Sequence, residues 1–205
     1  ISEMFSGYVL GDNGQDGFEI QYHKFNEDIS NWDTSKITNM SGAFKYSVFN
    51  QSIGNWDVSN VIDMSQMFSG SLFSREIRNW DVSKVEDMSY MFAGYSRAFN
   101  GQYNLGIYEV KNNFNKYLNT WNLSSLIDAS YMFEHSTYNR ELGNWNVSNV
   151  KKLKGMFKEN HEFNQDISNW NVSSVEDMSE MFFGAKKFNQ SLQNWNLFSV
   201  LDLSS

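Results

Sequence analysis

The sequence predicts a repeat solenoid, in which short parallel β-strands form one face and short helical turns form the other. Two observations predict this fold class. The seven tryptophans recur at a nearly constant spacing, and the same pattern of apolar residues surrounds each of them. A fixed period of roughly 20–50 residues is typical of chains whose repeats stack on one another.

The repeat is visible in the tryptophan positions, which are separated by 24, 24, 41, 24, 25 and 25 residues. The stretches FNEDISNWDTSKITNMSGAF, from Phe25, and FNQDISNWNVSSVEDMSEMF, from Phe163, show the shared frame. One unit cannot bury its own apolar residues, so we expect each repeat to bury them against the next. The sequence therefore predicts a single domain over residues 1–205, with about seven to eight repeats.

Each repeat is expected to contain two short elements. The Ile-x-Asn-Trp-Asp-Val stretch is rich in β-forming residues and predicts a strand. The Asp-Met-Ser-x-Met-Phe stretch has apolar residues at helical spacing and predicts one or two helical turns. Asp63 and Asp87 would cap the start of such turns, and Gly70 and Gly94 would suit the position after their end.

Two segments interrupt the frame at the same phase of the repeat, one near residues 7–22 and one near residues 97–113. We expect both insertions to emerge on the same side of the solenoid. Neither end of the chain has a recognisable capping repeat, which predicts that these residues belong to a longer protein or that partners cover the ends.

Composition excludes several functions. The chain has no Cys, so it can form neither a disulfide nor a thiolate metal site. Its formal net charge is −8 and its 16 Lys and Arg are scattered, which argues against nucleic acid as a partner. The apolar runs are too short for this segment to insert into a membrane.

The string FNQDISNWNVSSVEDMSEMFFGAKKFNQSL, residues 163–192, resembles the repeat of BspA-like leucine-rich-repeat surface proteins, including mycoplasma-type surface lipoprotein repeats. The resemblance covers nearly the whole chain outside the two insertions. It implies a leucine-rich-repeat-like solenoid displayed outside the cell or on its surface. For some members of that family it also implies adhesion or protein binding.

Possible metal sites have a simpler structural explanation. Asp33, Asp57 and Asp81 recur as a column that could hold Ca²⁺, but Asn replaces Asp in later repeats, so an Asx-turn explains the column better. The loop DNGQDGFE offers Asp12, Asp16 and Glu19 as weak calcium ligands, although a polar loop is the preferred interpretation. We therefore predict no metal and no cofactor.

No pattern of residues indicates catalysis, so the sequence predicts a non-enzymatic binding or adhesion module. The expected partner is a protein ligand or neighbouring copies of the chain itself. Two alternatives stay open: end-to-end assembly into a fibre, coat or surface layer, and carbohydrate binding. The candidate binding residues lie on the predicted strand side and in the insertions: Glu76, Arg78, Tyr117, Arg140, Tyr8, Tyr95, Tyr103 and Tyr108.

Overall fold

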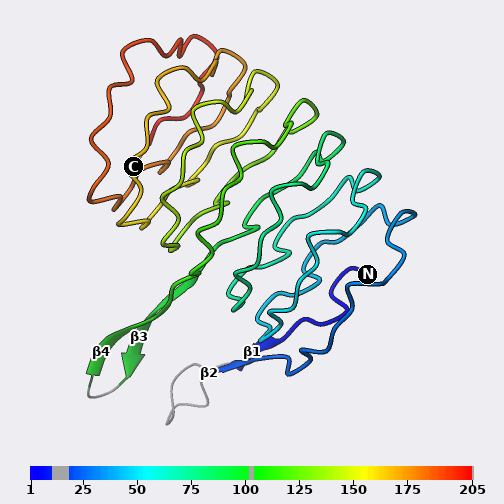
Figure 1. The fold of residues 1–205 in the computed structure, drawn as a ribbon. Helices are drawn as coiled ribbons and strands as arrows, with labels where there is room; N and C mark the ends of the chain where they lie inside the picture. Colours follow the sequence, from blue (N-terminus) through cyan, green and yellow to red (C-terminus); the bar gives the residue numbers. More distant parts are fainter. Residues whose placement is uncertain (11–18, 102–103, 205) are drawn as a thin grey trace.

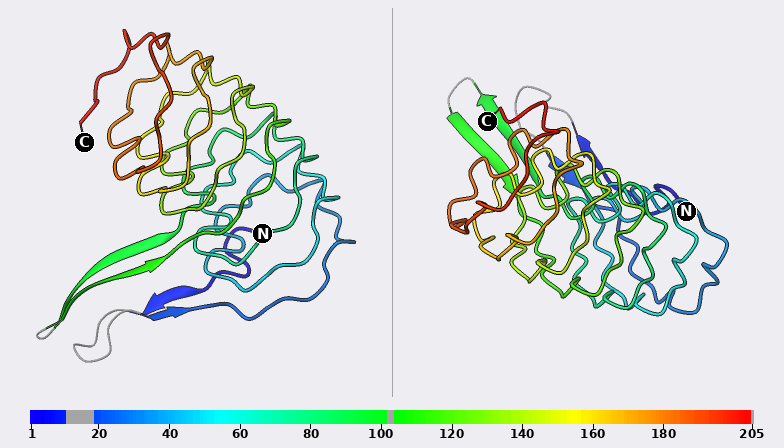
Figure 2. Two further views of the ribbon diagram at one scale, coloured as in Figure 1. Left: turned by 60° about the vertical axis from the view of Figure 1, so that its left-hand side comes forward. Right: turned by 90° about the horizontal axis from the view of Figure 1, so that it is seen from above.

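The computed structural model describes residues 1–10, 19–101 and 104–204. Successive repeats lie side by side along the molecule, and two hairpins project from one side of it (Figures 1 and 2). The first hairpin pairs β1 (Tyr8–Leu10) with β2 (Glu19–Gln21). The second pairs β3 (Tyr95–Gly101) with β4 (Asn104–Val110), and both pairs are antiparallel. The hairpins therefore depart from the repeat at the two interruptions of its frame.

The predicted fold class, a leucine-rich-repeat-like solenoid with a strand face and a helical face, is wrong. The described residues contain no helix, and their strands are the four short ones of the hairpins. Parallel pairing between repeats is limited to isolated bridges, such as Asn39 with Asp63 and Asp63 with Asp87. Most of each repeat consists of turns.

The helical turns are absent because the amides of the Asp-Met-Ser-x-Met-Phe stretch bond to the next repeat. A helix would direct them to carbonyls four residues earlier. Instead Met64 N donates to the Asp87 carbonyl at 2.9 Å, and Phe68 N donates to the Met91 carbonyl at 3.0 Å. Gln66, between them, has a φ of 57°, which interrupts a right-handed helix. The apolar residues of this stretch therefore have a helical spacing because they face the core from a turn, and not because they form a helix.

The predicted strand around each tryptophan is replaced by tight turns. Trp56 N donates to the Ile53 carbonyl at 3.1 Å, and Val61 N donates to the Val58 carbonyl at 2.9 Å. The β-branched residues of this stretch serve burial, since Val58 and Val61 are at most 1% exposed. Residues with high β-propensity are those that pack well on a half-buried surface, so their presence does not require an extended backbone.

The Asx-turn interpretation of the Asp and Asn column is confirmed. Asp57 Oδ1 accepts a hydrogen bond from Ser59 N at 3.0 Å, and Asn122 Oδ1 accepts the equivalent bond from Ser124 N at 3.1 Å. The pKa of Asp57 lies below its ordinary value, chiefly because of the side-chain hydrogen bond from Ser59. The position requires an acceptor oxygen and not a charge, which explains why Asn can replace Asp there in the later repeats.

The core consists of aromatic columns that run through the stack. One column consists of the Phe that ends the Asp-Met-Ser-x-Met-Phe stretch or its equivalent, and its ring centroids lie 5.8–5.9 Å apart from one repeat to the next: Phe44, Phe68, Phe92, Phe133, Phe157 and Phe182. Each tryptophan from Trp56 onward donates its indole N–H to an aliphatic residue's carbonyl in the preceding repeat, as Trp145 does to Leu118 at 2.9 Å. Trp32, the first of the seven, is 38% exposed. Stacking and this recurring bond together fix the register of neighbouring repeats.

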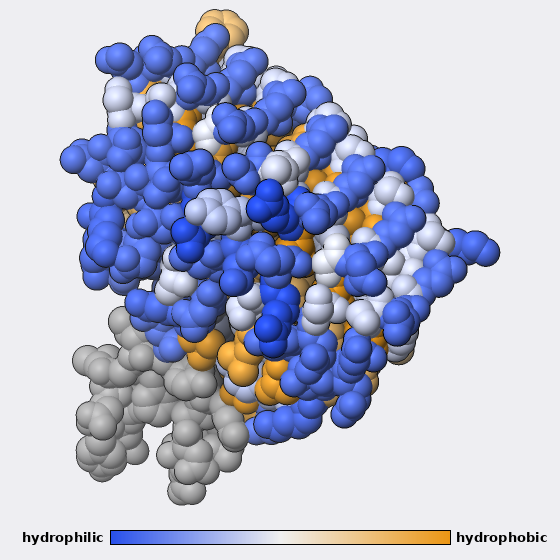
Figure 3. Space-filling view, in the orientation of Figure 1, coloured by the Kyte–Doolittle hydropathy of each residue, from blue (hydrophilic) through white to orange (hydrophobic). Residues whose placement is uncertain are grey.

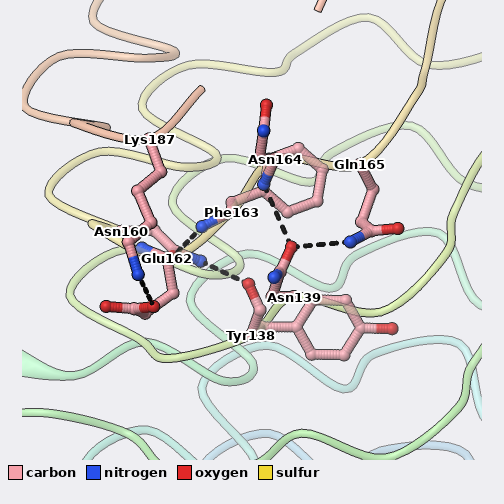
Figure 4. A network of polar contacts seen from close by, with 8 residues as sticks. All are labelled: Tyr138, Asn139, Asn160, Glu162, Phe163, Asn164, Gln165 and Lys187. Atoms are coloured by element: carbon pink, nitrogen blue, oxygen red, sulfur yellow. Dashed lines mark hydrogen bonds and ion pairs between the residues drawn. The ribbon is translucent and has the colours of Figure 1, made fainter. Parts of the chain in front are cut away.

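Asparagines that follow the aromatic residue form a second ladder (Figure 4). Asn139 Oδ1 accepts from Asn164 N at 3.0 Å and from Gln165 Nε2 at 2.8 Å. Nearby, the fully buried Asn160 donates its amide to the Tyr138 carbonyl at 3.0 Å. These side chains satisfy backbone groups that tight turns leave without a partner. We therefore assign the ladder to structure.

Replacing Tyr138 by Phe is expected to keep or raise stability, by up to about 1 kcal/mol. Tyr138 takes the place of a Phe in an aromatic column, and its side chain is completely buried. Its hydroxyl meets no hydrogen-bond partner of good geometry among the described residues. Urea unfolding of the variant and the native chain measures the change, and a loss above about 1 kcal/mol would show that the hydroxyl is well bonded.

Candidate binding face

Side chains in left-handed backbone conformations gather on the turns near the hairpins. One such position is the residue x of Met-Ser-x-Met-Phe, and another follows its Phe by two residues. Tyr90 and Tyr131 occupy the first position with φ of 56° and 57°, and Tyr46 and His135 occupy the second with φ of 47°. Other repeats have Gly there, as at Gly70. A non-glycine residue in this region costs roughly 1 kcal/mol, and such strain is frequent at functional sites.

We call the surface formed by these positions and the side chains between them the turn face. It comprises Lys45, Tyr46, Gln66, Tyr90, Tyr131, Glu134, His135, Lys158, Glu159 and Glu180.

Aromatic and charged groups contact one another along the turn face. The rings of Tyr90 and Tyr131 stack at a centroid distance of 4.7 Å. Lys158 Nζ lies 5.9 Å from the Tyr131 ring centroid and forms an ion pair with Glu180. Burial is the main cause that raises the pKa of Tyr90 to about 12. The face therefore offers immobilised rings and charges on a rigid support.

Glu134 is the most perturbed carboxyl group of the turn face. Its pKa is raised to about 7, chiefly by burial; the charge of Lys158 opposes this shift, and those of Glu180 and Glu159 add to it. Within the described part of the chain, its carboxylate makes no hydrogen bond or ion pair. A half-buried carboxyl group with a raised pKa is a candidate for a functional site.

His135 connects the turn face to the second hairpin. Its Nδ1 lies 3.5 Å from a carboxylate oxygen of Glu109, in β4. Burial lowers the pKa of His135, while the Glu109 carboxylate opposes this shift. Nδ1 makes no hydrogen bond of good geometry among the described residues, so the contact places β4 beside the stacked turns without a strong bond.

A hollow of about 240 Å³ opens in the turn face at the base of the second hairpin. Its walls include the charged residues Lys45 and Glu134, and Ser69 and Gly94 are the small residues that leave space between them. The face of the molecule drawn in Figure 3 is mostly hydrophilic, with narrow hydrophobic strips between rows of polar side chains.

The candidates predicted on the strand side form two separate pairs. Glu76 and Arg78 line a shared hollow of about 420 Å³, and Lys116 lies 3.7 Å from the Glu76 carboxylate. The guanidinium of Arg140 lies 4.9 Å from the ring centroid of Tyr117. The structure thus places Glu76 beside Arg78, and Tyr117 beside Arg140.

The insertion candidates separate into two groups. Tyr8 is 60% exposed on β1. Tyr95 begins β3 and meets the Tyr46 ring edge-on at 6.0 Å, so it joins the turn face. The others fall outside the described part of the chain: Tyr103, Asp12 and Asp16 entirely, and Tyr108 and Glu19 in their side chains. No group of three His, Asp or Glu suited to a metal ion occurs among the described residues.

Sequence reasoning missed Tyr46, Tyr90, Tyr131 and Glu134. The signal was the exchange of Gly for large side chains at fixed positions of the repeat, since Gly often marks a left-handed conformation. At the position x, Gly42 and Gly155 alternate with Tyr90 and Tyr131.

Comparison with known proteins gives a family and no function. The family described as "Mycoplasma protein of unknown function, DUF285" matches residues 15–106 and 105–205. No curated protein and no solved structure was found to be similar. The described residues include no helix that is long and apolar enough to cross a bilayer. Because the two matches together span nearly the whole chain, the protein belongs to this mycoplasma family of repeat-containing proteins of unknown function.

Proposed function

We propose that this chain is a non-enzymatic module, displayed on the cell surface or outside the cell, that binds a protein partner through its turn face. Extracellular display and a relation to BspA-like adhesins are parts of the proposal that rest on the resemblance of the repeat. The observation that carries the proposal is the set of non-glycine side chains held at positive φ on this one face.

The chemistry of the turn face favours a protein partner. Tyrosine rings provide large contact areas at a low entropic cost and are enriched in interfaces. Lys158 and Glu180 stand beside the stacked rings of Tyr90 and Tyr131, so apolar and charged contacts are available within one patch. Such mixed patches commonly contain the residues that dominate binding energy.

The test is a binding screen with purified extracellular proteins, followed by variants of the face. Partners are first identified by biolayer interferometry with the immobilised native chain. Replacing both Tyr90 and Tyr131 by Ala is expected to weaken binding at least about tenfold, because central aromatic residues typically contribute about 2 kcal/mol or more to the free energy of binding. The matched control replaces Tyr117 and Arg140, which also form an aromatic and cationic contact.

The control variant should bind within about twofold of the native chain, and urea unfolding should show that both variants remain folded under the assay conditions. Partner binding that depends on Tyr117 and Arg140 but not on Tyr90 and Tyr131 would assign the interface to the other face. The absence of any protein binder would count against the whole proposal.

End-to-end association of copies is a second candidate function. A mostly apolar hollow of about 540 Å³ lies on the repeat of Trp195 and is lined by Met178, Phe183 and Leu203. Phe198, on the same repeat, is 94% exposed. On the repeat at the opposite end of the stack, Trp32 is also partly exposed, which would provide an aromatic surface for a second copy. Sedimentation velocity over a concentration series tests this, and a strict monomer at high concentration would refute it.

A further inference from the structure

The hollow in the turn face has opposite charges on its walls. Lys45 and Glu134 both line it, and they belong to different repeats. Two intervening repeats contribute Ser69 and Tyr90 to the wall between them. A ligand in the hollow would therefore meet a cation and a carboxylate within a single small space.

Within the described part of the chain, neither group forms an ion pair, although the charge of Lys158 lowers the pKa of Glu134. Lys45 Nζ donates to the neutral Gln66 Oε1 and lies 5.2 Å from the Tyr46 ring centroid. Burial lowers the pKa of Lys45, which the charge of Glu3 opposes. Partly buried charges that lack a bonded counter-ion gain from an ionic ligand.

Tyrosine rings complete the surroundings. Tyr46, Tyr90 and Tyr95 all line the hollow, and Tyr46 and Tyr95 contact each other edge-on. Aromatic faces attract ammonium groups, and the attraction increases when water is excluded. Because the hollow measures about 240 Å³, below the common range for ligand pockets, only a small molecule fits.

We propose that this hollow binds a small zwitterion of the amino-acid class, with its ammonium group at Glu134 and its carboxylate at Lys45. The hollow shares Tyr90 and Glu134 with the turn face, but the proposal requires no protein partner, because the ligand is tested on the chain alone.

The first experiment is isothermal titration calorimetry of the full chain with a series of ω-amino acids of increasing length, from glycine to 6-aminohexanoic acid. The series finds the charge separation that matches the two walls. Butylamine and butyrate, each with one charge, serve as ligand controls. We expect saturable binding of at least one zwitterion, at least tenfold tighter than either control. Equal binding of a singly charged control, or no saturable binding in the series, would overturn the proposal.

Two charge-neutralising variants assign the contacts. Glu134→Gln and Lys45→Gln are each expected to weaken binding of the best zwitterion about tenfold or more, because each removes one charge-assisted contact. Glu141→Gln and Lys36→Gln replace exposed charges elsewhere and should leave affinity within about twofold. Unchanged urea midpoints exclude loss of fold as the cause. If both hollow variants bind normally, the ligand lies elsewhere and the assignment is wrong.

The pH dependence provides a readout that a structural role would not produce. The free Glu134 carboxyl has a pKa of about 7, set by burial, by Glu180 and Glu159, and by the opposing Lys158. An ammonium ligand requires the ionised carboxylate, so affinity should fall about eightfold to tenfold between pH 8 and pH 6. This fall should disappear in Glu134→Gln. A fall of the same size in that variant would show that another group controls binding. The calorimetry uses the native chain and the charge variants alone, so a failure to find a protein partner would leave its outcome unchanged.

Discussion

Replacing Trp145 by Ala is expected to lower the free energy of unfolding by about 3–5 kcal/mol. Trp145 is 3% exposed, and its ring packs 6.3 Å from Trp170 and 6.4 Å from Phe133, as centroid distances. The change would open a cavity between repeats and leave the Leu118 carbonyl without the indole N–H. Urea denaturation followed by circular dichroism measures the loss.

The matched control is Trp32→Ala. Trp32 has the same place in the frame but is 38% exposed. It stacks at 6.5 Å on Trp56 and meets the Phe5 ring at 6.0 Å, as centroid distances. Its removal should cost clearly less, about 1–2 kcal/mol. A loss below about 1 kcal/mol for Trp145, or equal losses at the two positions, would contradict the role of burial between repeats.

Gly70→Ala is expected to destabilise the fold by about 2–4 kcal/mol, the second largest effect that we predict. Gly70 has a φ of 61°, which an alanine adopts at some cost, and its new Cβ would lie 2.4 Å from the Tyr46 ring. The ring would have to move away from the turn face. Thermal and urea unfolding measure the loss.

Gly42→Ala separates the backbone cost from the steric cost. Gly42 has a nearly identical φ of 60°, but the nearest atom to a new Cβ is Glu3 Cγ at 3.1 Å, on an exposed and flexible side chain. We expect a loss of about 1 kcal/mol there. Adding Tyr46→Ala to Gly70→Ala should recover part of the larger loss. Equal effects at Gly70 and Gly42 would show that contact with the Tyr46 ring is unimportant.

The candidate site was only partly predictable. Tyr95 could be named because it stands beside an interruption of the repeat, and the structure places it on the turn face against Tyr46. Glu134 could not be found, because its perturbed pKa depends on burial and on charges from other repeats, including Lys158 and Glu180. The two opposite charges of the hollow, on Lys45 and Glu134, likewise come from positions that are far apart in the chain.

The sequence by itself determined which residues are buried and which small turns recur. The spacing of tryptophans predicted the buried columns, as Trp145 shows, and the exchange of Asp57 for Asn122 in later repeats predicted the Asx-turns. Both are local or periodic properties, so a comparison of the repeats reveals them without a structure.

Only the tertiary structure decided the backbone conformation between those points. Met64 and Phe68 follow a helical spacing, yet their amides bond to carbonyls of the next repeat, which are not neighbours in sequence. A backbone amide takes whichever partner the packed structure provides, and in this molecule the neighbouring repeat provides it. For this reason the apolar period alone predicted helical turns, whereas stacking produced turns with left-handed residues, several of them Tyr or Glu.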